Sequence, residues 1–437
     1  MKKINQWLSR CSSAWFVIYA TTAAFLTYFS MYAFRKTFSV ADFADVAGWD
    51  YQIDFKTTII LAQVIGYALS KFIGIKVVSE MNSSGRAMAI LALVMTSQLA
   101  LILFAILPNP YKPFSLFLNG LPLGMIWGLV FSFLEGRRVS EILGMGLSIS
   151  FIVSSSVVKS VGQWLMLEFG VSEFWMPATT GFIFTIPLFI SVFFLSQIPP
   201  PNLADQQQRH IRQPMNRADR KRLFFSYLPG LIALILSYML LTAIRDYSDN
   251  FAAEIWSSLG YGDQPSIFSH AALYTSLAIL VLLSCIMLVK DNVKALLTNH
   301  GFILVGIITI GLSTLLFELG IISGEVWMIT HSTGIYLAYI PFNCLLFDRM
   351  LAVIKDKANA GFLIYMADAM GYAGSVGILL YKNFFNTNLS WLTFMIQSSY
   401  LISIVGSVLI ISSAGYFILK LPKNDTKLAA NPTLVKY

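Results

Sequence analysis

Charge is scarce in this sequence: only 12% of its 437 residues are Asp, Glu, Lys or Arg, whereas 57% are hydrophobic. A water-soluble protein of this length could not cover so much apolar surface. Cysteine is also scarce, and Cys11, Cys285 and Cys344 have no paired spacing that would indicate a disulfide or a metal site. The sequence lacks a Walker loop, a nucleophile elbow and a metal-ligand cluster. We therefore expect neither an enzyme nor a bound cofactor.

Long apolar runs make up most of the chain, and runs of about 18 residues or more are typical of membrane-spanning helices. The start, "MKKINQWLSR", is short and basic, and the first apolar run is long enough to be a true span rather than a signal peptide. The sequence thus predicts an all-α membrane protein. We expect twelve spans, at 13–35, 57–78, 86–107, 113–135, 141–166, 172–196, 223–245, 266–289, 298–320, 325–347, 360–383 and 391–419.

The positive charges indicate the orientation of these spans. Of the 30 Lys and Arg residues, 22 fall on the side of the N-terminus, 6 fall on the opposite side and 2 lie inside spans. The positive-inside rule then places both termini in the cytoplasm. The net charge of +8 is accordingly a topology signal, and we expect no nucleic-acid partner.

A polar stretch divides the chain into two halves. Residues 197–222 are basic and begin near three consecutive prolines, which is typical of a linker. We expect an N-terminal six-helix bundle at 1–196, a cytoplasmic linker at 197–222, a C-terminal six-helix bundle at 223–420 and a cytoplasmic tail at 421–437.

The two halves repeat a polar pattern. Tyr28, Tyr32 and Arg35 share one face of the first span, and Tyr238, Thr242 and Arg245 follow 210 residues later at the same spacing. Parallel repeats of six helices are the arrangement expected of a transporter with a central site between its halves.

Ionisable residues inside spans are costly and therefore suggest function. Arg35 and Arg245 are either anchors at the outer interface or a pair that binds a phosphate or carboxylate between the halves. Lys71 and Lys159 are candidates for the same polar interior. Asp368 can form an ion pair with a lysine, for which Lys159 is a plausible partner, or can carry a coupling proton.

Charged residues also mark the cytoplasmic ends of spans four and ten. Span four ends at Glu135, with Arg138 just beyond it, and Asp348 and Arg349 occupy the matching place at the end of span ten. We expect capping charges or gating salt bridges between the halves there.

The strings "YFSMYAFRKTFSVA", "IGYALSKFIGIKVVSE" and "AGFLIYMADAMGYAGSVG" resemble spans one, two and eleven of the organophosphate:phosphate antiporters of the major facilitator superfamily. The layout is also similar to a poorly characterised bacterial branch of that superfamily, known mainly as a domain of unknown function. The resemblance implies the major facilitator fold and a location in the bacterial inner membrane. It implies inorganic phosphate as the counter-substrate.

The same resemblance implies roles for particular residues. Arg35 and Arg245 would bind a phosphoryl group near mid-membrane, with Tyr28, Tyr32 and Lys71 nearby, and the first helix would continue past Arg35. The sequence departs from the family where serines and Lys159 replace a histidine of span five, where the usual G-x-x-x-D-R loop reads "GIKVVSEMNSSGR", and where acidic "DYSDNF" follows Arg245.

Three functional hypotheses follow. The first is a secondary transporter of a small organic anion, with Arg35, Arg245, Tyr28, Tyr32, Lys71 and Lys159 as the binding site. The second is a proton-coupled symporter of a carboxylate or another organic solute that uses Asp368. The third is a transporter-like sensor. We expect a monomer whose partners are a small anionic solute and the lipid bilayer.

Overall fold

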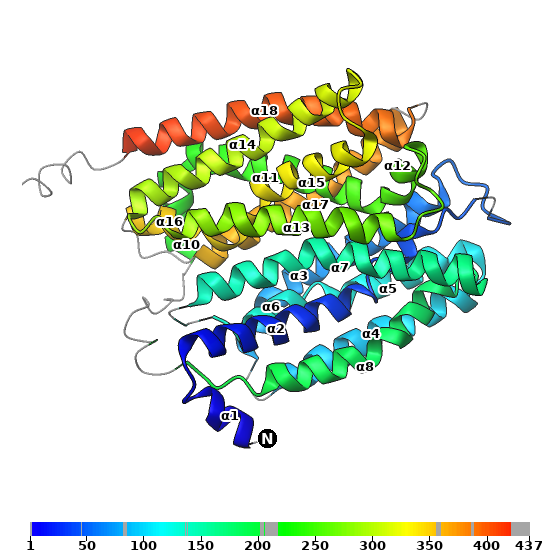
Figure 1. Ribbon diagram of the computed structural model, residues 1–437, viewed down its shortest axis with the longest axis horizontal. Coiled ribbons are helices and arrows are strands. Elements are labelled where there is room, and N and C mark those ends of the chain that lie inside the picture. Colours follow the sequence, from blue (N-terminus) through cyan, green and yellow to red (C-terminus); the bar gives the residue numbers. More distant parts are fainter. Residues whose placement is uncertain are drawn as a thin grey trace, which may run out of the picture.

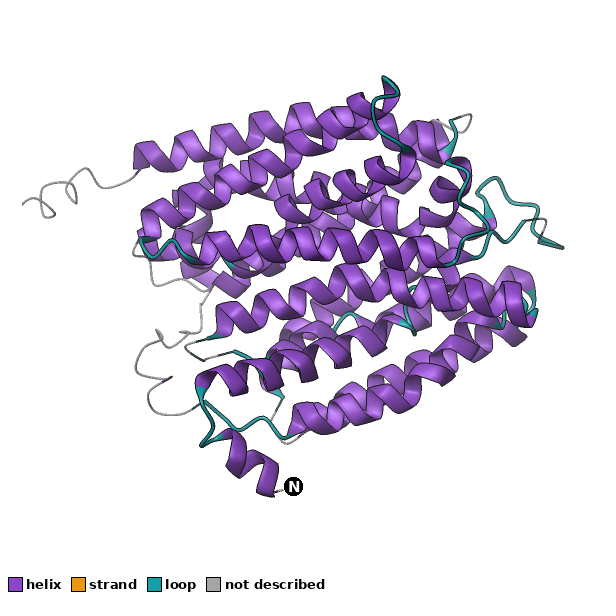
Figure 2. Cartoon of the chain, in the orientation of Figure 1, coloured by secondary structure: helices purple, strands orange, loops and turns teal. Residues whose placement is uncertain are grey.

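The computed structural model is built from helices joined mostly by short loops, as Figure 2 shows for its described part. The structure describes residues 2–44, 46–81, 85–135, 137, 139–201, 205, 217–354, 360–385 and 389–420.

The long helices form two bundles, one from each half of the chain, which lie side by side in Figure 1. The N-terminal bundle contains α2 (Ser13–Tyr32), α3 (Phe55–Glu80), α4 (Arg86–Ile106), α5 (Lys112–Leu123) with α6 (Ile126–Phe131), α7 (Ser140–Phe169) and α8 (Met176–Ser196). The C-terminal bundle contains α11 (Leu228–Asn250), α13 (Ser266–Met287), α14 (Asn292–Glu318), α15 (Gly324–Cys344) with α16 (Leu346–Ile354), α17 (Ala360–Phe385) and α18 (Trp391–Lys420).

Five short helices complete the described elements: α1 (Lys2–Leu8), η1 (Thr37–Val40), η3 (Asn109–Tyr111), α10 (Arg217–Ser226) and α12 (Ala252–Ser258). The expected linker at 197–222 lies partly outside the described residues, and the expected tail at 421–437 lies wholly outside them. The domain limits therefore stay a prediction.

The helices match the expectation of a multi-pass membrane protein. Within the described residues, ten helical segments are long and apolar enough to cross a membrane, and the pair α15 and α16, bent by 47°, makes eleven. The remaining predicted span forms α17, a 26-residue helix. Twelve helical segments in two six-helix bundles therefore confirm the predicted fold class.

The fourth segment of each bundle is broken in a similar way. α5 stops at Leu123 and α6 continues it, while α15 stops at Cys344 and α16 continues it. A proline, Pro122 or Pro341, lies within the last turn of the longer helix in each case. Because proline cannot donate a backbone hydrogen bond, it weakens a helix at this point.

One implication of the resemblance is wrong. α2 ends at Tyr32 and does not continue as an α-helix through Arg35. Arg35 lies in a turn in which its own N–H donates to the carbonyl of Tyr32 at 3.0 Å, and η1 follows. The turn directs both Arg35 and Lys36 into the protein, where they are 6% and 4% exposed.

The bundles meet along five long helices. α7 of the N-terminal bundle packs on α13 and α15, and α3 packs on α17. This interface holds most of the buried charge that is described below.

Candidate functional site

A small cavity lies between the bundles, where α7 faces α11, α13 and α15. Its volume is about 60 Å³, roughly twice the ~30 Å³ share of one water molecule in the liquid. Its charged wall consists of Lys159 from α7 with Arg245 and Asp249 from α11, and its apolar wall includes Phe268 and Met328. Among the described residues, no cluster of His, Cys, Asp or Glu could hold a metal ion. The cavity therefore offers space for a compact charged group.

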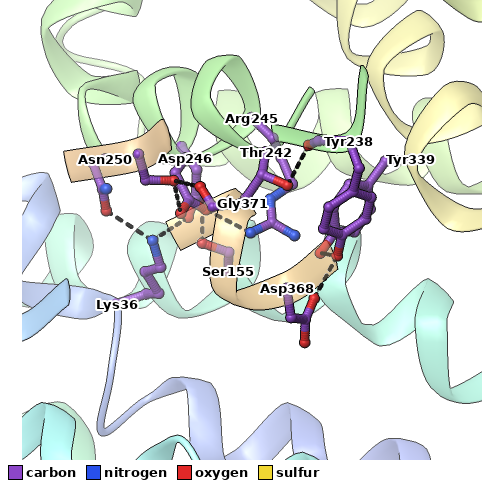
Figure 3. Close-up of polar contacts among 12 residues, drawn as sticks. Lys36, Ser155, Tyr238, Thr242, Arg245, Asp246, Asn250, Tyr339, Asp368 and Gly371 are labelled. Atoms are coloured by element: carbon purple, nitrogen blue, oxygen red, sulfur yellow. Dashed lines mark hydrogen bonds and ion pairs between the residues drawn. The ribbon is translucent and has the colours of Figure 1, made fainter. Parts of the chain in front are cut away.

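The carboxylate of Asp249 holds two cations that belong to the other bundle. Its Oδ2 lies 2.6 Å from the Nζ of Lys36, and its Oδ1 lies 2.6 Å from the Nζ of Lys159. The hydroxyl of Ser155 donates to the same Oδ1 at 2.5 Å. Lys36 also donates to the side-chain oxygen of Asn250 at 2.7 Å (Figure 3). Asp249 therefore links η1 and α7 to the end of α11.

Arg245 is fixed within the C-terminal bundle. Its Nη2 and Nε lie 2.6 Å and 3.2 Å from the Oδ1 of Asp246, and the hydroxyl of Ser375 donates to the other oxygen at 2.7 Å. The guanidinium carbon lies 4.2 Å from the ring centroid of Tyr339, within the range of a cation–π interaction. Figure 3 shows this group between Asp246 and Tyr339.

Arg35 lies in a different environment. Its guanidinium carbon lies 3.8 Å from the ring centroid of Tyr67 and 5.8 Å from that of Tyr32, whose ring in turn contacts Tyr28. In the described part of the chain its guanidinium makes no ion pair, and its buried Nε has no hydrogen-bond partner. Of the two arginines, however, only Arg245 is among the residues that line the cavity.

Asp368 pairs with a different lysine from the one expected. Its Oδ2 lies 3.4 Å from the Nζ of Lys71, and the hydroxyl of Tyr238 donates to its Oδ1 at 2.6 Å (Figure 3). The hydroxyl of Tyr339 lies 2.8 Å from that of Tyr238. The predicted pair of Lys159 and Asp368 is therefore wrong, because α17 faces α3 across the interface while Lys159 reaches the end of α11.

Two glycines allow α17 to lie directly against α11. A Cβ at Gly371 would lie 2.8 Å from the Oγ1 of Thr242, and one at Gly374 would lie 2.6 Å from the Cγ of Met239. Such contacts are too short for a larger residue without movement of a helix or side chain. This close packing positions Asp368 beside α11.

Two further contacts join the bundles. Lys56, at the start of α3, forms an ion pair with Glu254 of α12, and the side-chain exposures are 2% and 17%. Burial raises the pKa of Glu254, and the neighbouring ammonium opposes this shift. The hydroxyls of Ser160 on α7 and Ser269 on α13 lie 2.6 Å apart. The interface is thus polar over several turns of helix.

The predicted gating residues lie at helix ends. Glu135 follows α6, Asp348 lies in the first turn of α16, and Arg138 lies outside the described residues. The Nη1 of Arg349 donates to the Oδ1 of Asn292 at 2.9 Å, which is a contact within one bundle. A gating role for these four residues stays a prediction.

Five charged residues of the interface were not among the predicted site residues: Lys36, Lys56, Asp246, Asp249 and Glu254. Lys36 was expected to face a cavity beside Arg35 only through the family resemblance, and Lys56 was counted only as a charge of the outer loops. A signal for the carboxylates was present, because Asp246 and Asp249 follow Arg245 at i+1 and i+4, and i+4 is the spacing of neighbours on one helix face.

Comparison with known proteins gives a fold but no curated relative, since no curated protein matches this sequence. Solved structures that resemble the chain include three transporters. A D-xylose–proton symporter has a TM-score of 0.64 at 12% sequence identity, and the match covers 94% of this chain and 98% of the symporter chain. The nucleoside transporter NupG has a TM-score of 0.57 at 15% identity, with 92% and 98% covered. A POT family transporter in complex with a thioalcohol-conjugated peptide has a TM-score of 0.59 at 11% identity, with 92% and 96% covered.

These structures are secondary transporters of the major facilitator type, and the chain shares their fold. A family model matches residues 37–420 under the description "Family of unknown function (DUF5690)". The chain belongs to this family.

Proposed function

We propose that this protein is a secondary transporter that moves a small organic anion across the bacterial inner membrane, and that the favoured class of substrate is a phosphate ester. The two bundles would expose a central site to each side of the membrane in turn, with both termini in the cytoplasm. The fold supports transport, and the charges at the bundle interface support an anion.

The observation that carries this proposal is an excess of buried positive charge. Asp249 is shared by two lysines, and Arg35 makes no ion pair among the described residues. Among the described residues, the interface therefore has two more cations than carboxylates. The cations are Arg35, Lys36, Lys56, Lys71, Lys159 and Arg245, and the carboxylates are Asp246, Asp249, Glu254 and Asp368.

Uncompensated charge inside a membrane protein is costly. A bound anion would relieve this cost, and a phosphate monoester carries about two negative charges at neutral pH. Arg245 and Lys159 line the cavity from opposite bundles. Guanidinium and ammonium groups both donate charge-assisted hydrogen bonds to phosphate oxygens, so one anion could bind both bundles. Arg35, with Tyr28 and Tyr32, would complete the site.

The test is a thermal-shift screen of phosphate esters, phosphonates and carboxylates on purified protein. A phosphate ester should stabilise the wild type, and Arg35→Gln and Arg245→Gln should each lose this response. Arg10→Gln is the matched control, because it removes an exposed cation beyond the bundles. Stabilisation by carboxylates alone, or an unchanged response in both variants, would contradict a phosphate-ester site.

Transport itself is tested in proteoliposomes. Exchange of the identified ester for inorganic phosphate, without a pH gradient, would support antiport. Binding without accumulation would instead indicate a sensor.

A second candidate is proton-coupled symport through Asp368. The observation that favours it is the 3.4 Å separation of this buried carboxylate from Lys71, which is longer than the other charge pairs of the interface. Uptake that collapses with a protonophore, and that Asp368→Asn makes insensitive to the protonophore, would support this candidate. Uptake indifferent to the pH gradient would exclude it.

A further inference from the structure

Asp249 places a negative charge in the wall of a cavity that is otherwise suited to anions. An anion would be repelled by this carboxylate unless another group offsets its charge. The structure shows the offset, because two ammonium groups and one hydroxyl surround the carboxylate at hydrogen-bonding distance. The carboxylate therefore cancels one of the two lysines and leaves the other uncompensated.

A charge balance around the cavity gives its capacity for negative charge. Lys36, Lys159 and Arg245 contribute three positive charges, and Asp246 and Asp249 contribute two negative charges. Of these five, Lys159, Arg245 and Asp249 line the cavity, and Lys36 and Asp246 are counted because they pair with Asp249 and Arg245. The local excess is therefore one positive charge. Arg35 is left out because it does not line the cavity and, among the described residues, forms no ion pair with a residue that does. Replacement of Asp249 by a neutral residue would raise this excess to two without adding any group that binds phosphate.

We propose that Asp249 sets the charge of the anionic head group that the cavity accepts. This inference rests on the proposed function, since it assumes that an anion binds there. Asp249 limits the positive potential at the cavity, so that the wild-type site favours a dianionic over a monoanionic head group less strongly than the two lysines would without it. The interaction of a head group with a charge a few ångströms away grows with each unit charge that the head group carries.

The experiment compares two probes of the same shape, methylphosphonate and methanesulfonate, in mildly alkaline buffer. The phosphonate is then a dianion and the sulfonate a monoanion, and each has a tetrahedral head on one methyl group. Dissociation constants are measured on purified full-length protein. The ratio of the two affinities is the readout, because any change in bundle opening affects both probes alike and cancels.

Asp249→Asn should raise the preference for the phosphonate by about tenfold or more, since the added unit of positive charge acts twice as strongly on a dianion. Lys159→Gln should lower the preference. The double variant Lys159→Gln/Asp249→Asn should return it to the wild-type value, and it removes both partners together should the single aspartate variant fail to fold. Asp291→Asn is the control, because it changes the net charge equally at an exposed helix N-cap and keeps a capping side chain.

The outcomes separate this inference from the proposed function. Binding of both probes with the same ratio in wild type, Asp249→Asn and the double variant would overturn the role of Asp249 and leave the anion site in place. A change of equal size in Asp291→Asn would also overturn it, because net charge alone would then explain the effect. Failure of both probes to bind the wild type would overturn the anion site, and this inference with it.

Discussion

The ion pair between Lys56 and Glu254 allows a quantitative test of the bundle interface. It joins the start of α3 to α12, and its side chains are 2% and 17% exposed. Removal of one partner from a buried pair costs about 3–5 kcal/mol, chiefly because the other charge remains buried. Glu254→Gln leaves the almost fully buried ammonium of Lys56, so we expect a loss of about 3 kcal/mol in the free energy of unfolding. Lys56→Met leaves the more exposed carboxylate, and we expect about 2 kcal/mol at neutral pH.

The two variants should respond differently to pH. Burial already raises the pKa of Glu254 above its usual value, and loss of Lys56 raises it further. The folded Lys56→Met variant then binds a proton more tightly than its unfolded chain does. Its stability therefore increases as the pH falls from the raised pKa toward the pKa of the unfolded chain, and the penalty is complete only above the raised pKa. In Glu254→Gln the carboxyl is gone, so this site contributes no such gain.

Unfolding in mixed micelles, followed by tryptophan fluorescence at neutral pH and at about pH 5, measures both free energies. Lys56→Met should become more stable relative to Glu254→Gln at the lower pH. A difference between the two variants that stays constant over this range would refute the reasoning, because Glu254 could not then be a buried, raised-pKa carboxyl. The control is Asp291→Asn, which keeps both Lys56 and Glu254 and therefore shows how the other titrating groups of the chain change the stability between the two pH values.

Two further predictions concern helix packing and capping, and both are measured by the same unfolding experiment. Gly371→Ala should destabilise the protein by about 1–3 kcal/mol, because the added Cβ would contact Thr242. Gly377→Ala on the same helix is the control and should be neutral or stabilising, because no atom lies within 4 Å of its added Cβ. Equal effects of the two substitutions would mean that α17 and α11 are not in close contact. Asp54→Ala should lower the free energy of unfolding by about 1 kcal/mol, because Asp54 is the N-cap of α3 and its side chain accepts the N–H of Thr57 at 2.8 Å. Asp54→Asn should retain most of that free energy, since asparagine is also a good N-cap. A larger loss of stability in Asp54→Asn than in Asp54→Ala would argue against capping.

The sequence was sufficient to locate the helices but not to predict which charged residues pair between the two bundles. A bilayer requires each span to satisfy its own backbone hydrogen bonds over a fixed thickness, so apolar length locates helices directly. Even α17, which carries Asp368 and is less apolar, was located correctly. The predicted pair of Lys159 and Asp368 failed because the rotation and tilt of one bundle against the other decide which charges meet, and no single helix pattern encodes them.

The repeated sequence pattern also hid a difference between the halves. Arg245 lies within α11 and pairs with the adjacent Asp246, whereas Arg35 lies in a turn after α2 and stacks on Tyr67. The spacing of the two motifs is identical, but the neighbours that decide their electrostatics lie outside the repeat. The matching motifs of the two halves therefore did not predict that Arg35 and Arg245 lie in different electrostatic environments.

The distribution of charge between the bundles carries the argument one step further. Five of the six interface cations belong to the N-terminal bundle, and all four interface carboxylates belong to the C-terminal bundle. The bundles therefore attract each other in this conformation, and their full separation must break the ion pairs of Lys36, Lys56, Lys71 and Lys159. Under the proposed function, an anion is the group that could replace a carboxylate as the partner of these cations. Because only one carboxylate serves both Lys36 and Lys159, competition is easiest there, and the strength of that contact would couple the binding of the solute to the movement of the bundles.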